Sequence, residues 1–171
     1  NLEQTALMIT QTGGGCRASN YIYLLHKALE KAGLSNIPVI SLNVSGLEKQ
    51  PGFHLNASML RKFLAALIYG DALMYLSNKI RPYEVIQGTT DALAQKWLAK
   101  LSDAFASGKA QALSNMKKLT KALASEFAKV PIVHRPKTKV GIVGEIYIKY
   151  AALGNNNLEK FLQKQDCEYM L

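Results

Sequence analysis

Apolar residues gather in short continuous runs near both ends of the chain, and these runs predict β-strands. Residues 5–11 and 37–42 form two such runs, and 139–147 and 167–171 form two more. An unbroken apolar run about as long as one strand is typical of a strand that a parallel sheet buries on both faces. We therefore expect parallel strands, and the first pair should be joined by a right-handed crossover.

Apolar residues at helical spacing occupy most of the rest of the chain. Residues 17–32 carry apolar side chains three and four positions apart, and Gly33 follows where a helix C-terminus favours glycine. Further helices are expected at 59–76, 90–106, 110–129 and 158–165. Gly108 either separates the second and third of these helices or lies inside one long helix.

Together these elements predict an α/β fold in which Rossmann-like β-α-β units with parallel strands flank a helical middle segment. We place the first unit at 1–56, the helical segment at 57–138 and the start of a second, truncated unit at 139–171. The two units form either separate half-domains or one α/β domain with a helical insertion. Because the chain opens almost directly into a strand and closes inside another, we expect a piece of a longer protein.

A glycine-rich turn ending in a cysteine joins the first strand to the first helix. Gly13, Gly14 and Gly15 allow the backbone to turn tightly and to approach a ligand, and Cys16 follows them. The free N–H groups of a helix N-terminus stabilise a thiolate, and Arg17 adds a fixed positive charge. This setting predicts a metal or cluster ligand, a nucleophile or a redox group. A packed small side chain is an equally good interpretation of Cys16, and a phosphate or CoA could instead bind the turn amides.

A second polar turn follows the third strand. Glu145 stands near the end of that strand, where α/β proteins place their sites, and Asn155, Asn156 and Asn157 follow Gly154. Glu145 is either a general base or an acceptor of backbone N–H bonds. Asparagine tolerates left-handed turns and caps helices, and we expect Asn157 to cap the last helix. A run of three exceeds what one cap needs and could supply amide donors to a polar ligand.

Composition adds a charge pattern that the elements alone do not show. The 171 residues carry a net charge of +9, and ten basic residues lie between 96 and 139 beside two acids. An acidic neighbouring domain, a phosphorylated cofactor or nucleic acid could pair with this segment, or the segment is a solvated helical face. Nucleic acid is disfavoured because aromatic residues do not alternate with these lysines to stack on bases.

The sequence also bears on compartment. No run approaches the roughly 20 apolar residues of a membrane span, and the first residues lack the charged start of a signal peptide. Two cysteines, Cys16 and Cys167, do not make a disulfide framework. We therefore expect a cytoplasmic protein with no membrane partner.

Three stretches carry a resemblance to a known family. They are 11–21, reading QTGGGCRASNY, 140–147, reading VGIVGEIY, and 153–157, reading LGNNN. Together they resemble the 2-hydroxyacyl-CoA dehydratase superfamily. The closer likeness is to the dehydratase-like region of the large activase-type fusion proteins known as activators of 2-hydroxyglutaryl-CoA dehydratase. Residues 38–43, 46–48 and 81–83 fit the same region, so the likeness covers essentially the whole chain.

The resemblance implies a Rossmann-like architecture and an iron–sulfur cluster of the 4Fe–4S type in the cytoplasm of an anaerobe. Cys16 matches a cluster-ligand cysteine, and Glu145 matches a catalytic turn near the substrate or cluster. The other residues that the resemblance places around the cofactor are Gly13, Gly14, Gly15, Arg17, Asn20, Asn155 and Asn156. Such a cluster takes about four thiolates, so the remaining ligands would come from other segments or a partner subunit.

The implied function is ATP-coupled transfer of low-potential electrons to a 2-hydroxyacyl-CoA dehydratase, or dehydration of the acyl-CoA itself. The implied partners are other domains of the same polypeptide or a dehydratase subunit, an acyl-CoA, and a second copy of the chain. The phosphate-binding motifs of the family's ATPase modules do not occur here, so we expect no ATP site in this chain. The alternative is a non-catalytic interaction module whose basic helices at 96–139 dock an acidic partner domain.

Overall fold

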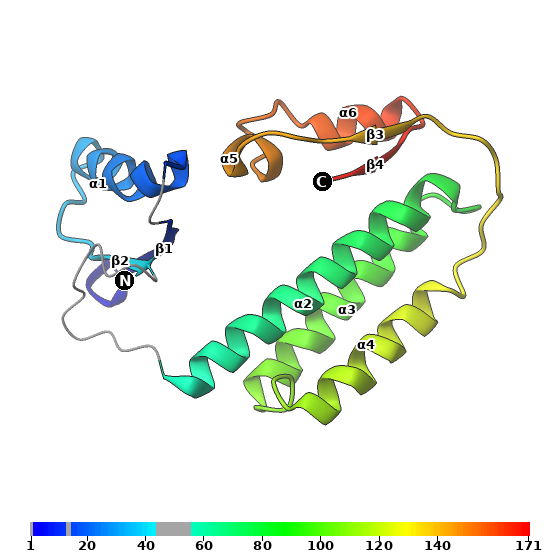
Figure 1. Ribbon diagram of the computed structural model, residues 1–171, viewed down its shortest axis with the longest axis horizontal. Coiled ribbons are helices and arrows are strands. Elements are labelled where there is room, and N and C mark those ends of the chain that lie inside the picture. Colours follow the sequence, from blue (N-terminus) through cyan, green and yellow to red (C-terminus); the bar gives the residue numbers. More distant parts are fainter. Residues whose placement is uncertain (1, 13–14, 44–55) are drawn as a thin grey trace. The chain divides into compact units, whose positions relative to one another are not determined.

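A computed structural model describes residues 2–12, 15–43 and 56–171 (Figure 1). The chain divides into two compact units, Asn1–Leu55 and Asn56–Leu171. Each unit has its own hydrophobic core, and each is described by itself. The fold is mixed α/β, and every strand pair in the described residues is parallel.

The first unit is a β-α-β unit. Strand β1 (Leu7–Gln11) pairs with β2 (Val39–Asn43) in parallel, as the sequence predicts. The short 3-10 helix η1 (Leu2–Gln4) precedes β1, and between the strands lie the 3-10 helix η2 (Arg17–Asn20) and helix α1 (Tyr21–Lys31). Its core consists of Ile22, Leu29, Ile37 and Val39.

Two details of this unit bear on the sequence analysis. Gly33 ends α1 as predicted: its φ is +70°, and the next N–H, from Leu34, donates to the Leu29 carbonyl at 2.8 Å. The prediction of a fully buried first strand is wrong, because Met8 is 52% exposed. The side chains of β1 alternate between covered and open faces, since α1 packs against one face only.

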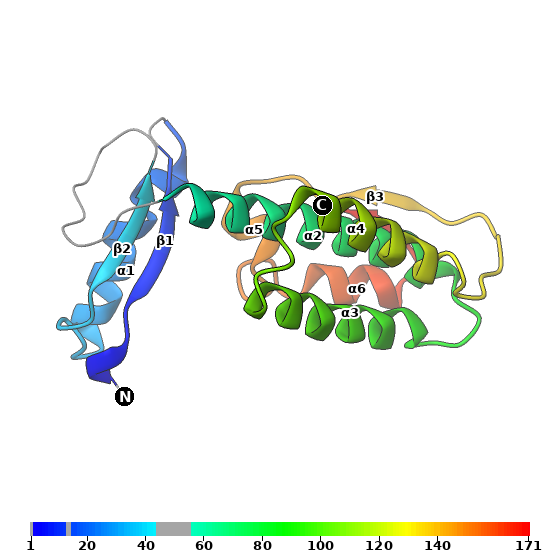
Figure 2. The ribbon, with the colours of Figure 1, turned by 90° about the horizontal axis from the view of Figure 1, so that it is seen from below.

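The second unit begins with three helices that pack side by side (Figure 1, Figure 2). They are α2 (Ala57–Ile80), α3 (Thr89–Ala106) and α4 (Leu113–Phe127), and the 3-10 helix η3 (Arg81–Tyr83) follows α2. Their shared core is built around Tyr69, Trp97, Leu123 and Phe127. Gly108, with φ at +70°, separates α3 from α4 and so decides between the two readings of that glycine.

The chain then forms a second parallel strand pair. Strand β3 (Lys139–Gly141) pairs with β4 (Glu168–Met170), and helices α5 (Ile146–Tyr150) and α6 (Leu158–Lys164) lie between them in sequence. The predicted strand over 139–147 is wrong beyond Gly141. Gly144 turns with φ at +152°, and the Glu145 carboxylate accepts from the Ile148 N–H and so starts a helix.

Strand β4 contacts α2, so this last segment and the helices form one unit. The Glu168 carboxylate accepts from Lys79 Nζ at 2.8 Å and from the Tyr83 hydroxyl at 2.5 Å. These bonds tie β4 to the end of α2 and to η3. No helix in the described part of the chain has both the length and the apolar character that crossing a bilayer requires.

Candidate functional site

The turn that carries Cys16 is held by hydrogen bonds on both sides. Cys16 has an extended backbone, and its carbonyl accepts from the Ser19 N–H at 3.1 Å as η2 begins. Ser19 Oγ donates to the Thr12 carbonyl at 2.5 Å. Gly13 and Gly14 lie outside the described residues. Serine at position 19 therefore closes the turn from the end of β1 to the start of η2.

Two further hydrogen bonds connect the turn before α1 to strands β1 and β2. The Gln11 amide donates to the Ser19 carbonyl at 3.1 Å, and the Ser41 hydroxyl donates to Gln11 Oε1 at 2.7 Å. The bonds join β1, η2 and β2. The sequence did not lead us to predict this network. Its only sign there is that Gln11 and Ser41 are polar residues at or near the ends of two apolar runs.

Cys16 lies at the surface, immediately before η2. It is a free cysteine, and its residue is exposed, as are Gly15, Arg17 and Asn20. A Cβ atom added to Gly15 would meet no other atom within 4 Å, so there is open space beside the thiol. Asn20 precedes α1 without a side-chain cap bond. The turn thus presents a thiol, a guanidinium and an amide to a ligand.

The donors for a metal are incomplete in the described chain. No three His, Cys, Asp or Glu side chains come together among the residues the structure describes. Cys167 is partly buried, and its Sγ donates to the Gln165 carbonyl at 3.5 Å. Four thiolates are typical of a 4Fe–4S cluster, and Cys16 supplies one.

The second predicted turn serves as a pair of helix caps. Glu145 Oε1 accepts from the Ile148 N–H at 3.0 Å and caps α5. Asn155 caps α6, since its Oδ1 accepts from the Leu158 N–H at 3.2 Å and its amide donates to the Lys149 carbonyl. Asn157 occupies the N-cap position of α6 as predicted, but its φ is +57° and its side chain makes no cap bond, which Asn155 supplies instead.

Left-handed geometry explains the length of the asparagine run. Asn156 and Asn157 have φ at +55° and +57°, a region that asparagine tolerates better than most residues. Gly154 is required for a different reason. A Cβ atom there would lie 2.6 Å from Cε1 of the Tyr147 ring. All three asparagines therefore have structural roles.

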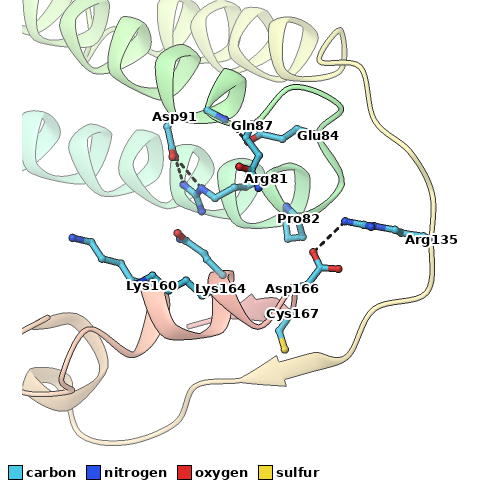
Figure 3. A pocket seen from close by; sticks show the side chains of 12 residues that line it. Arg81, Pro82, Glu84, Gln87, Asp91, Arg135, Lys160, Lys164, Asp166 and Cys167 are labelled. Carbon is cyan, nitrogen blue, oxygen red and sulfur yellow. Dashed lines mark hydrogen bonds and ion pairs between the residues drawn. The ribbon is translucent and has the colours of Figure 1, made fainter.

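A cavity that the sequence analysis missed lies between η3, the start of α3, the connector at 131–138 and α6 (Figure 3). Its volume is about 450 Å³. Basic side chains from separate parts of the chain converge on it, namely Arg81, Arg135, Lys160 and Lys164. Only the docking of β4 and α6 against the helices brings them together, so spacing in the sequence could not reveal them.

The acids at this cavity have partners already. Arg81 pairs with Asp91 at 2.8 Å, and Arg135 pairs with Asp166 at 3.1 Å. Lys137 contacts the same Asp166 carboxylate, and these cations hold its pKa below the ordinary value, with the Lys137 hydrogen bond as the largest cause. The Glu84 carboxylate caps α3.

A buried carboxylate stands behind the cavity. Hydrogen bonds from Lys79 and Tyr83 hold the pKa of Glu168 below its ordinary value. In return, the bond to Glu168 raises the pKa of Lys79 and that of the Tyr83 hydroxyl. The group links β4 to α2 and η3.

The basic segment has two kinds of lysine. Lys96 and Lys100 lie 3.0 Å and 3.8 Å from the carboxylate of Glu126, and their attraction lowers its pKa, the Lys96 hydrogen bond contributing most. Between residues 101 and 130, all five lysines are exposed and form no ion pair with the described residues, namely Lys109, Lys117, Lys118, Lys121 and Lys129.

Comparisons with models of protein families, with curated proteins and with solved structures give no match for this chain.

Proposed function

We propose that this chain is part of a cytoplasmic iron–sulfur protein of the 2-hydroxyacyl-CoA dehydratase type, with a Rossmann-like architecture. One observation carries the proposal: a free, exposed thiol at a turn between a parallel strand and a helix, with Arg17 beside it. The parallel β-α-β unit and the resemblance of 11–21 to that family support it.

In this proposal Cys16 binds iron, and the Arg17 guanidinium and the turn amides donate to the cluster sulfurs. Donors of this kind adjust a cluster's reduction potential. The other thiolates come from a second copy, from another part of the polypeptide or from a dehydratase subunit, because the described residues offer no complete ligand set. When bound, the cluster supplies one-electron chemistry at low potential.

The second turn has a supporting part in this proposal. Glu145 and Asn155 hold α5 and α6 in place through their cap bonds. A catalytic role for Glu145 toward an acyl-CoA stays a prediction, since its carboxylate accepts the Ile148 N–H as the cap of α5.

Alkylation tests whether Cys16 is a ligand. In protein purified anaerobically from its own cells, we expect Cys16 to resist iodoacetamide, and to react once a chelator has removed iron. Mass spectrometry locates the modified cysteine, and Cys167, which is partly buried and belongs to the other unit, is the internal control. Equal modification of Cys16 before and after chelation would contradict the proposal.

A second candidate function rests on the five lysines without acidic partners. Three of them, Lys117, Lys118 and Lys121, lie on α4. They support a module that docks an acidic partner domain, with Cys16 as a structural residue. Binding of a polyglutamate peptide, measured by calorimetry, should weaken steeply as salt is raised. A peptide that binds equally well after all three lysines are changed to glutamine would exclude this face.

A further inference from the structure

We propose that the cavity lined by Arg81, Arg135, Lys160 and Lys164 binds an organic phosphate, holding its phosphate or diphosphate group between these cations. The proposal does not rest on the iron–sulfur assignment, because all of these residues lie in the second unit. It also differs from an anion site at the glycine turn of the first unit.

The two lysines of α6 carry most of the argument. Lys160 and Lys164 are four positions apart, so both lie on one face of the helix and both line the cavity (Figure 3). Like charges at this spacing repel each other. Within the described residues neither lysine has a carboxylate partner. A bound anion would remove the repulsion and give both ammonium groups a partner.

The arginines on the other walls are held in place before any ligand arrives. The Arg81 side chain is 18% exposed, and its guanidinium donates to Asp91 at 2.9 Å and to Asn78 at 2.9 Å. Arg135 is oriented by Asp166. Because these bonds already order Arg81, binding loses less side-chain entropy at that position, whereas the Arg135–Asp166 pair is exposed and adds little.

The acids lining the cavity offset the charge of the arginines but form no ion pair with the lysines of α6. Asp91 and Asp166 are each paired with an arginine, and Glu84 accepts from the N–H groups of Gly88 and Thr90, both at 2.7 Å. The lysines of α6 therefore remain the cations available to an incoming anion. Phosphate groups suit such a set because they accept several charge-assisted bonds at once.

Size favours an organic phosphate over a free ion. A second cavity of about 300 Å³ shares Asp91, Lys160 and Gln163 with the first and extends to Asn155. The two spaces together exceed what one phosphate ion fills, and the amide side chains of the second suit a polar organic group. We therefore assign the phosphate end to Lys160 and Lys164, the lining cations that form no ion pair in the described residues, and the organic end to the side of Asn155.

Calorimetric titration of the whole chain with ADP, pyrophosphate and inorganic phosphate tests the proposal. We expect ADP to bind more tightly than inorganic phosphate. The variant Lys160→Gln/Lys164→Gln should weaken ADP by at least about tenfold, since each lost bond involves a charged group. Both lysines are exposed and form no ion pair within the described residues. Circular dichroism should therefore show that the variant keeps the fold.

The matched control is Lys27→Gln/Lys31→Gln, which removes the same charge at the same four-residue spacing from exposed positions of α1. ADP affinity retained in this variant and lost in the cavity variant supports the site. Equal weakening in both would show attraction to overall charge and overturn the proposal. No heat with millimolar ADP would overturn it, and so would inorganic phosphate binding as tightly as ADP. The titration uses iron-free protein, so its failure leaves the role of Cys16 untouched.

Discussion

At the scale of single residues, Glu168 shows how one buried carboxylate joins two parts of the second unit. Its side chain is 9% exposed, and both of its oxygens accept hydrogen bonds, one from Lys79 and one from Tyr83. A buried carboxylate is tolerated only when it is paired in this way. Removing its charge should therefore loosen β4 from α2.

We expect Glu168→Gln to lower the free energy of unfolding by about 1–2 kcal/mol at neutral pH. The folded state holds the pKa of Glu168 below its unfolded value. The stabilisation is therefore complete above the unfolded pKa and is lost as pH falls through the folded pKa. Urea unfolding at several pH values should show the wild type and variant converging in acid. Asp71→Asn, at an exposed position of α2, is the control, and a difference that persists in acid would contradict the account.

Gly154 offers a second test at residue scale. Alanine there would push against the Tyr147 ring, whose nearest atom lies 2.6 Å from the added carbon. Because Tyr147 is 46% exposed, its ring can move to a less favourable rotamer, so we expect Gly154→Ala to lower stability by about 0.5–1 kcal/mol. Gly70→Ala is a control with the opposite expected sign. Position 70 lies inside α2, and a Cβ added there would meet no atom within 4 Å, so alanine should raise the free energy of unfolding by about 0.5–1 kcal/mol.

At the scale of elements, the turn between α3 and α4 is anchored to α2 by one buried hydrogen bond. The Tyr69 hydroxyl donates to the Ala110 carbonyl at 2.9 Å, and both residues are almost fully buried. Burial also raises the pKa of Tyr69. The bond fixes where α4 begins, because it holds the residues that precede that helix.

We expect Tyr69→Phe to destabilise the second unit by about 1–2 kcal/mol, because the buried Ala110 carbonyl would lose its partner. Tyr75→Phe, on the same helix at a 50% exposed position, should change stability by less than about 0.5 kcal/mol. Thermal unfolding followed by circular dichroism measures both. Equal effects from the two variants would show that the hydroxyl of Tyr69 does not anchor the turn.

Periodicity predicted the helices of this protein well and the last segment poorly, for a physical reason. Trp97 and Leu123 fall on apolar stripes at helical spacing, and both are fully buried in the core between helices. The run at 139–147 is equally apolar, yet Val143 is 86% exposed. Local chemistry overrides the pattern there, since Gly144 turns the chain and Glu145 caps a helix.

The two candidate sites also differ in how far the sequence could predict them. The Cys16 turn was visible in the sequence because its residues are contiguous, although the bonds of Gln11 and Ser19 that fix it were not foreseen. The basic cavity could not be predicted. Arg81, Arg135 and Lys164 are far apart in the chain and meet only after β4 packs against α2.

At the scale of the whole molecule, the two candidate sites belong to different units. The thiol turn lies in Asn1–Leu55, and the basic cavity lies in Asn56–Leu171. The net charge of +9 is concentrated in the second unit, where five lysines and the cavity remain open to anionic partners. We therefore propose metal chemistry in the first unit and anion recognition in the second.

The most direct test of the central claim is the iron and sulfide content of protein purified anaerobically from its own cells. Wild type, Cys16→Ala and Cys167→Ala are compared, so that each variant removes one thiol. The account predicts stoichiometric iron and sulfide in the wild type and in Cys167→Ala, and their loss in Cys16→Ala. Iron content unchanged in Cys16→Ala would contradict it, and Cys16 would then be a structural residue of the turn.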